Sequence, residues 1–86
     1  METNNVLKIK EKVQKITETM DKKNHRYDDF IWFSAINYTT QAEYCGELKL
    51  FLEDVWKNEE VECCRTQVCE LLQMVNDYFE MSGDVT

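Results

Sequence analysis

The stretch FIWFSAI, residues 30–36, decides the fold, because its apolar side chains would lie nearly all the way round a helix but would also suit a buried strand. A lone strand would have no partner, since no hairpin signal flanks it and the segments on either side have helical patterns. We therefore expect a helix here. Thr40 and Glu43 fit a capping box, which leaves two alternatives open for the middle segment, residues 27–57: one continuous helix, or two helices with a break near residues 37–40.

Both flanking segments have the apolar periodicity of amphipathic helices. From residue 4 to about residue 21, and again after residue 58, apolar side chains recur at spacings of three and four residues. Asn58 is the expected N-cap of the last helix, and Gly83 is its expected C-terminal stop. The positions expected to face the core are Val6, Ile9, Val13, Ile16 and Met20 in the first segment, and Val61, Cys64, Val68, Leu71, Val75 and Tyr78 in the last.

The composition supports long helices in one small domain. The 86 residues include no proline and only two glycines, so the turn residues that β-sandwiches and barrels need are scarce. The polar run 21–26 is the expected turn before the middle segment, where an apolar stripe from Ala42 to Val55 supplies further core. These patterns predict an all-α fold over residues 1–86: a small antiparallel bundle of three long helices, or four if the middle one breaks near 37–40.

The four cysteines are expected to be free thiols. Residues 1–10 lack the continuous apolar run of a signal peptide, and no stretch approaches the ~20 apolar residues of a membrane span. We therefore expect a soluble cytoplasmic protein, in a compartment that keeps thiols reduced. Cys63, Cys64 and Cys69 share one predicted helix, on which Cys64 and Cys69 point ~140° apart. Neither a metal site nor a cofactor is expected.

The sequence offers little that would support catalysis. His25, the only histidine, lies in the polar turn beside Arg26, and no glycine-rich phosphate loop or carboxylate-pair motif accompanies it. We therefore expect a protein that is not an enzyme.

A helix-turn-helix regulator is one alternative, because Ala42 and Gly46 lie four residues apart, ahead of Leu52 and Val55, at offsets that such motifs often use. The surrounding stretch carries four acidic side chains against two lysines, which would repel phosphate groups rather than attract them. Direct nucleic-acid binding is therefore not expected. Gly46 is instead expected to mark a place where two helices approach closely.

The net charge of −7 is unevenly distributed along the chain. Residues 1–26 carry seven basic and four acidic side chains, residues 27–57 carry two and six, and residues 58–86 carry one and seven. A basic first helix would be attracted to the acidic helices, which helps to fix which surfaces meet. The acidic two-thirds would also suit a basic partner.

Two groups of residues are the candidate protein-binding sites. Aromatic residues crowd the middle segment, and a helix that is apolar all round needs more cover than two other helices provide. Either a fourth helical segment or a second molecule would complete that cover. The aromatic candidates are Tyr27, Phe30, Trp32, Phe33 and Tyr38, and the acidic candidates, on one side of the last helix, are Glu59, Glu62, Glu70 and Asp77.

These features favour a non-enzymatic protein-binding regulator or inhibitor, whose partner is a protein with a basic surface or a second copy of the chain. No membrane partner is expected. An alternative is a nucleic-acid mimic, an inhibitor of the kind that mobile elements use against host defences, although the basic first helix argues against it. The helix-turn-helix regulator is the third hypothesis.

Overall fold

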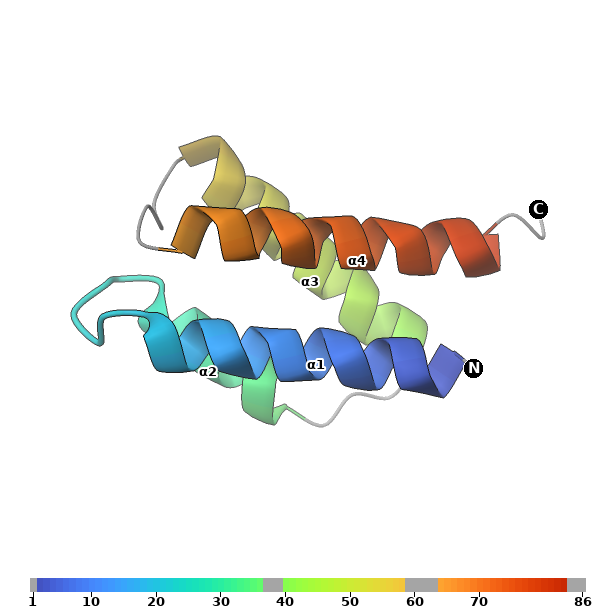
Figure 1. Cartoon of the computed structure of the whole chain (residues 1–86), viewed down its shortest axis with the longest axis horizontal. Helices are drawn as coiled ribbons and strands as arrows, with labels where there is room; N and C mark the ends of the chain where they lie inside the picture. The colour runs from blue at the N-terminus through green and yellow to red at the C-terminus, as the bar shows by residue number, and fades with distance from the viewer. Residues whose placement is uncertain (1, 37–39, 59–63, 84–86) are drawn as a thin grey trace.

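A computed structural model describes residues 2–36, 40–58 and 64–83 of the chain, and the regular structure in these residues is helical without any strand. The helices are α1 (Glu2–Thr19), α2 (Tyr27–Ala35), α3 (Gln41–Asn58) and α4 (Arg65–Gly83) (Figure 1). The predicted all-α class is therefore confirmed, and the structure gives the middle segment as two helices, α2 and α3, rather than one. Within the described ranges, no helix combines the length and the apolar character that crossing a bilayer requires.

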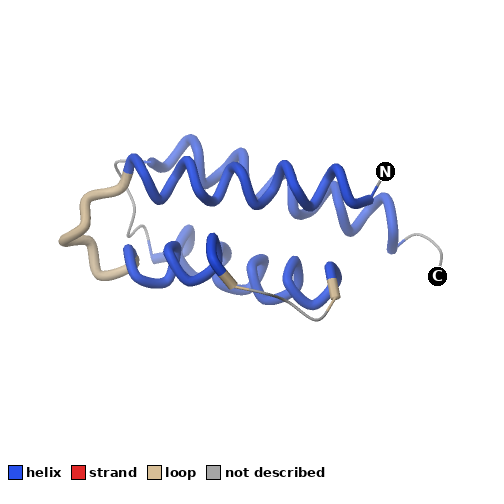
Figure 2. The backbone as a smooth tube through the Cα atoms, turned by 90° about the horizontal axis from the view of Figure 1, so that it is seen from below, coloured by secondary structure: helices blue, strands red, loops and turns tan. Residues whose placement is uncertain are grey.

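The four helices form two layers (Figure 2). In one layer α1 and α4 lie side by side and run in opposite directions, although they are far apart in the sequence. In the other layer the backbone of α2 lies against α1, and the backbone of α3 lies against α4. Each helix of the second layer therefore covers a different helix of the first.

All four helical segments contribute to one hydrophobic core. The buried apolar side chains are Val6, Ile9, Val13, Ile16 and Met20 from the α1 segment, Phe30 and Phe33 from α2, Tyr44, Cys45, Leu48, Leu52 and Val55 from α3, and Cys64, Val68, Leu71, Val75 and Tyr78 from the α4 segment. Both predicted apolar seams are confirmed, except for Val61, which lies outside the described residues. Each buried aliphatic side chain contributes roughly 1.5–3 kcal/mol relative to an exposed one.

Short polar side chains organise the connections on both sides of α2. In the predicted turn 21–26, Asp21 Oδ1 accepts a hydrogen bond from Lys23 N (2.9 Å), and Asn24 Oδ1 accepts one from Arg26 N (2.8 Å). Before α3, Thr40 Oγ1 accepts a hydrogen bond from Glu43 N (3.0 Å). Thr40 therefore caps α3 as the capping box predicted.

The C-terminal end of α2 is held by side chains from two other helices. Tyr44 Oη donates a hydrogen bond to Phe33 O (2.7 Å), and Lys10 Nζ donates one to Ile36 O (3.3 Å). Carbonyl groups at a helix end have no partner within the helix, so these donors satisfy groups that would otherwise need water. A nine-residue helix is marginal in isolation, and α2 therefore depends on these tertiary contacts.

The predicted role of Asn58 as the N-cap of the last helix is wrong. Asn58 is instead the last residue of α3, where its Nδ2 donates hydrogen bonds to Asp54 O (2.9 Å) and Asp54 Oδ1 (3.0 Å), one turn earlier. The side chain of Asn58 thus bonds backwards into α3, and α4 begins at Arg65.

The predicted role of Gly46 is also wrong. A Cβ atom added at Gly46 would meet no atom within 4 Å, so no neighbouring helix requires a glycine there. The reason lies in helical spacing, because Gly46 lies one turn before Leu50, which is 70% exposed. Both residues belong to the solvent side of α3.

Candidate functional site

The aromatic residues of α2 divide between the core and the surface. Phe30 and Phe33 are buried, and both rings contact Phe51 of α3, with centroid distances of 5.0 and 5.1 Å. Phe33 also lies 6.1 Å from the ring of Tyr44. These four rings fill the space between α2 and α3, so a helix of the same chain provides most of the cover that the aromatic segment needs. Phe30 and Phe33 are therefore removed from any binding surface.

Trp32 and its neighbour Ile31 remain outside. They are 48% and 39% exposed, and they lie with Asp28 and Ala35 on the side of α2 opposite Phe30 and Phe33. We call Asp28, Ile31, Trp32 and Ala35 the outer face of α2. The rings of Trp32 and Phe33 contact edge to face, with their centroids 4.8 Å apart. This contact holds the indole ring of Trp32 against the helix.

The other predicted aromatic residues contribute less to this surface. Tyr27 is partly buried against the core, and Tyr38 lies outside the described residues. Leu7 and Leu50 are the other large exposed apolar side chains, and each is alone on its helix. Single exposed apolar residues are common on proteins, whereas a contiguous pair including tryptophan is more informative.

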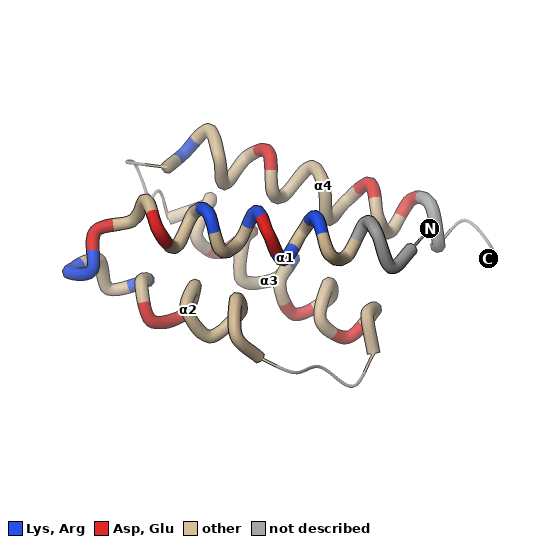
Figure 3. The backbone as a smooth tube through the Cα atoms, turned by 60° about the horizontal axis from the view of Figure 1, so that its bottom comes forward, with Lys and Arg blue, Asp and Glu red and all other residues tan. Residues whose placement is uncertain are grey.

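The acidic side of α4 is present, and part of its charge is neutralised within the protein. Glu70, Gln73, Asp77 and Glu80 are exposed and follow at spacings of three, four and three residues, opposite the buried seam. Glu70 Oε1 lies 2.6 Å from Lys12 Nζ, which joins α4 to α1. Figure 3 shows where the charged residues lie along the backbone, with Lys and Arg gathered on α1 and the turn after it and acidic residues along α4. Glu59 and Glu62 lie outside the described residues.

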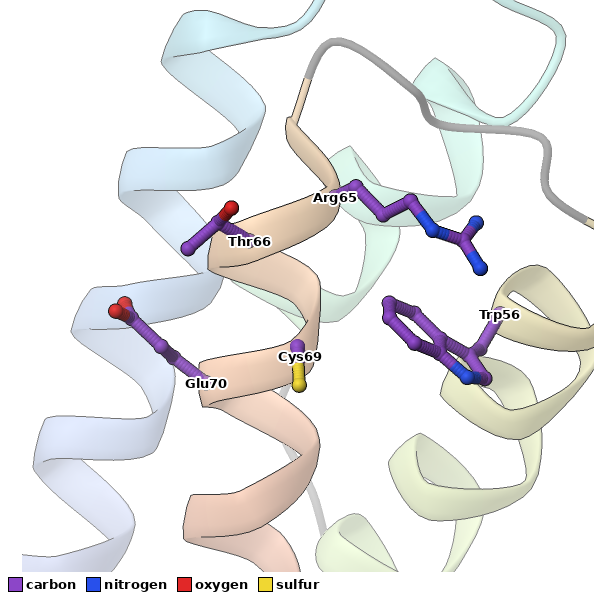
Figure 4. A pocket seen from close by; sticks show the side chains of 5 residues that line it. All are labelled: Trp56, Arg65, Thr66, Cys69 and Glu70. Carbon is purple, nitrogen blue, oxygen red and sulfur yellow. The ribbon is translucent and has the colours of Figure 1, made fainter.

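An open pocket of about 380 Å³ lies across the start of α4 (Figure 4). Its lining residues are Trp56 from α3 and Arg65, Thr66, Cys69 and Glu70 from α4. The guanidinium carbon of Arg65 lies 3.9 Å from the centroid of the Trp56 ring, a cation–π contact that joins the end of α3 to the start of α4.

One guanidinium nitrogen of Arg65, Nη1, is buried without a hydrogen-bond acceptor among the described residues. No hydrogen bond or ion pair links Arg65 to any residue in the described parts of the chain. Gln67 Oε1, in the same turn of α4, is likewise enclosed without a donor among these residues. No sequence pattern predicted this site, although Arg65 is the only basic residue between positions 58 and 86.

Three of the four cysteines lie in the described residues. Cys45 and Cys64 are buried and Cys69 is exposed, and none of the three is in a disulfide, whereas Cys63 lies outside the described residues. Burial raises the pKa of Cys45 from 9.0 to about 11, so this thiol stays protonated at neutral pH. In the described ranges, no three His, Cys, Asp or Glu side chains lie close enough together to hold a metal ion.

Comparison with known proteins adds no relative, since no protein-family model, curated protein or solved structure matches the chain.

Proposed function

We propose that this protein is a non-enzymatic binding protein that regulates or inhibits a protein partner through the outer face of α2. The observation that carries this proposal is the pair Ile31 and Trp32, which stay 39% and 48% exposed while the other rings of α2 fill the core. Tryptophan is among the residues that most often dominate the energy of protein interfaces. The pair therefore provides an anchor for a partner.

The charge around this anchor favours a different protein over a second copy of the chain. Asp28 lies on the outer face of α2 beside Trp32, and the net charge of the chain is −7. A two-fold interface would bring this face against itself, so that the two Asp28 carboxylates would approach each other. A partner whose apolar pocket has a basic rim would avoid this repulsion and would also associate faster at low salt.

The same proposal includes the arrangement of the fold and the cellular compartment. We propose that residues 1–86 act as one antiparallel bundle in the cytoplasm. The shared core of all four helices supports the statement that they form one bundle, and the reduced thiols of Cys45 and Cys69 suit a reducing compartment.

Charge-matched substitutions test the proposal. A photo-crosslinking amino acid at position 35, on the outer face of α2 beside the anchor, first identifies a partner. The dissociation constant of that partner is then measured for the wild type, Trp32→Glu and Leu50→Glu. Leu50 is the matched control, because it is a more exposed apolar residue on a different helix and receives the same charge. Trp32→Glu should weaken binding by about 30-fold or more, as expected for an interface anchor.

The outcomes separate the competing interpretations. Equal affinity of Trp32→Glu and the wild type would exclude the outer face of α2 as the binding site. If sedimentation shows a wild-type dimer that Trp32→Glu converts to a monomer, the partner is a second copy of the chain.

A nucleic-acid mimic is the second proposal, because the exposed carboxylates of Glu70, Asp77 and Glu80 form a row on α4. The lysines of α1 weigh against it, since Lys12 already pairs with Glu70. Loss of partner binding on reversing Asp77 and Glu80 to lysine, with Trp32→Glu unaffected, would favour the mimic. A helix-turn-helix regulator would instead require specific DNA binding, which the exposed acids on α3 oppose.

A further inference from the structure

Arg65 occupies a costly position in the fold. Its Nη1 atom is enclosed and has no acceptor among the described residues, and an unmatched buried donor destabilises the folded state. Arg65 is also the first residue of α4, where the helix dipole disfavours a positive charge. Unsatisfied groups of this kind need a specific explanation, and departures from local preference concentrate at functional sites.

The chemistry of Arg65 favours one class of ligand. Its guanidinium carbon lies 3.9 Å from the centroid of the Trp56 ring, and a guanidinium is a planar fork of N–H groups from which a carboxylate can accept two parallel hydrogen bonds. We infer that the pocket at Trp56 and Arg65 binds a carboxylate carried on an apolar body. This site is separate from the outer face of α2 and does not depend on the function proposed for that face.

Charge balance favours a carboxylate over a phosphate group. Arg65 is the only cation among the residues that line the pocket, and it matches the single negative charge of a carboxylate. Glu70 also lines the pocket, but its Oε1 lies 2.6 Å from Lys12 Nζ, and its side chain points away from Arg65 toward α1 (Figure 4). A phosphate group with nearly two charges would leave an excess beside Glu70, in a protein whose net charge is already −7.

The other residues that line the pocket explain why the carboxylate would be carried on an apolar body. The indole ring of Trp56 and the side chain of Cys69 provide apolar contacts, and Thr66 adds a hydroxyl group at the other side of the pocket. The volume of about 380 Å³ lies in the lower part of the range for small-ligand sites. A small aromatic or aliphatic acid fits this chemistry, and so does the C-terminal carboxylate of a peptide that ends in a large apolar residue.

A nitrogen-15 NMR titration of the full chain tests the inference. The signals to follow are the indole N–H of Trp56 and the Nε–H of Arg65, assigned with Trp56→Phe and Arg65→Lys. The probes are phenylacetate, phenylacetamide, inorganic phosphate, and a short peptide ending in leucine, prepared with either a free carboxylate or a C-terminal amide. Both acids should shift the two signals and both amides should not, and the acid that binds more tightly identifies the source of the carboxylate.

Two single-site variants distinguish binding by two parallel hydrogen bonds from Arg65 from general attraction to positive charge. Arg65→Lys should weaken binding about tenfold, since a point charge replaces two parallel hydrogen bonds. Lys8→Gln removes one positive charge from the exposed side of α1 and should leave the affinity unchanged. Circular dichroism checks that both variants keep their helical content, and the comparison of acid with amide on the wild type is independent of the variants.

Several results would overturn the inference. These are the absence of any shift with either acid at millimolar concentration, equal binding of amides and acids, or tighter binding of phosphate than of either acid. An equal loss for Lys8→Gln and Arg65→Lys would show attraction to charge in general, and would also reject a site at Arg65.

Discussion

On each flank of α3 an arginine lies over an aromatic ring, but only one of the two arginines has an acidic partner among the described residues. On the side of α2, Arg26 lies over Phe51 with its guanidinium carbon 5.7 Å from the ring centroid, and its Nη2 lies 2.6 Å from Asp54 Oδ2. On the side of α4, Arg65 lies over Trp56 at 3.9 Å and has no acceptor among the described residues. Each arginine stands at the start of a helix. One arginine therefore closes a contact between helices, whereas the other leaves a pocket open to a ligand.

The largest expected effect on the free energy of unfolding comes from removing an aromatic ring on either flank of α3, Phe33 on the side of α2 or Trp56 on the side of α4. Phe33→Ala should lower the free energy of unfolding by about 3–5 kcal/mol, because Phe33 is buried and its ring stacks on Phe51. Trp56→Ala should cost clearly less, since Trp56 is only partly buried and lines an open pocket. Urea denaturation measures both values. Similar losses for the two variants would mean that the pocket is closed in solution.

The free energy of unfolding should depend on pH through the buried thiol of Cys45 in α3. The unfolded chain releases the Cys45 proton near the ordinary pKa of 9.0, whereas the folded chain holds it to about 11. The contribution of Cys45 to stability is thus fully present below pH 9 and is lost as the pH rises through 11. Urea denaturation across this interval should show a steeper loss for the wild type than for Cys45→Ala. Equal slopes would refute the burial effect.

The exposed Cys69 should react with a maleimide in the folded protein.

Replacing each arginine by methionine tests the comparison directly. Arg26→Met should lower the free energy of unfolding by about 1 kcal/mol, because it leaves Asp29 and Asp54 without their cation, and solvent exposure limits the loss. Arg65→Met should cost nothing or stabilise the protein slightly, since it removes an unmatched donor and an unfavourable charge from the first turn of α4. Urea denaturation at low and high salt distinguishes them, and only the Arg26 effect should shrink with salt. A larger loss for Arg65→Met than for Arg26→Met would contradict this expectation, because it would show that the cation–π contact with Trp56 or an acceptor in the folded protein outweighs the unmatched donor.

The smallest expected effect lies on the solvent side of α3, between the two flanks. Gly46→Ala should raise the free energy of unfolding by about 0.5–1 kcal/mol, because alanine is the better helix former and the added Cβ meets open space. The midpoint of thermal unfolding measures this change, with Ala42→Gly on the same helix as the reverse control. A destabilised Gly46→Ala would indicate that another helix or molecule approaches this surface.

The elements of the fold that depend on local pattern were predictable from the sequence. The seam from Val6 to Met20 and the cap at Thr40 follow from spacing alone, and both are confirmed. The orientation of α2 did not follow, because a helix that is apolar all round gives periodicity no preferred face. Contacts with other helices decide it, because Phe33 turns inward onto Phe51 and Tyr44 while Trp32 stays outside.

The candidate pocket could not be predicted for a related reason. Trp56 and Arg65 lie nine positions apart on different helices, and they meet only because α4 returns along α3. Hydrophobic periodicity describes single elements, so it carries no information about a contact between the end of one helix and the start of the next. For the same reason, the position of Gly46 relative to other helices was open until the tertiary arrangement was known.

The side-by-side pairing of α1 with α4 has a consequence for synthesis on the ribosome. The seam of α1, including Val13 and Ile16, packs into a core to which Leu71 and Val75 of α4 also belong. During translation α1 leaves the exit tunnel well before α4 has been made, so the nascent chain presents an uncovered apolar seam for that interval. The core closes only when Arg65–Gly83 emerges. Chaperones that bind exposed apolar segments would therefore encounter α1 before the chain can bury it.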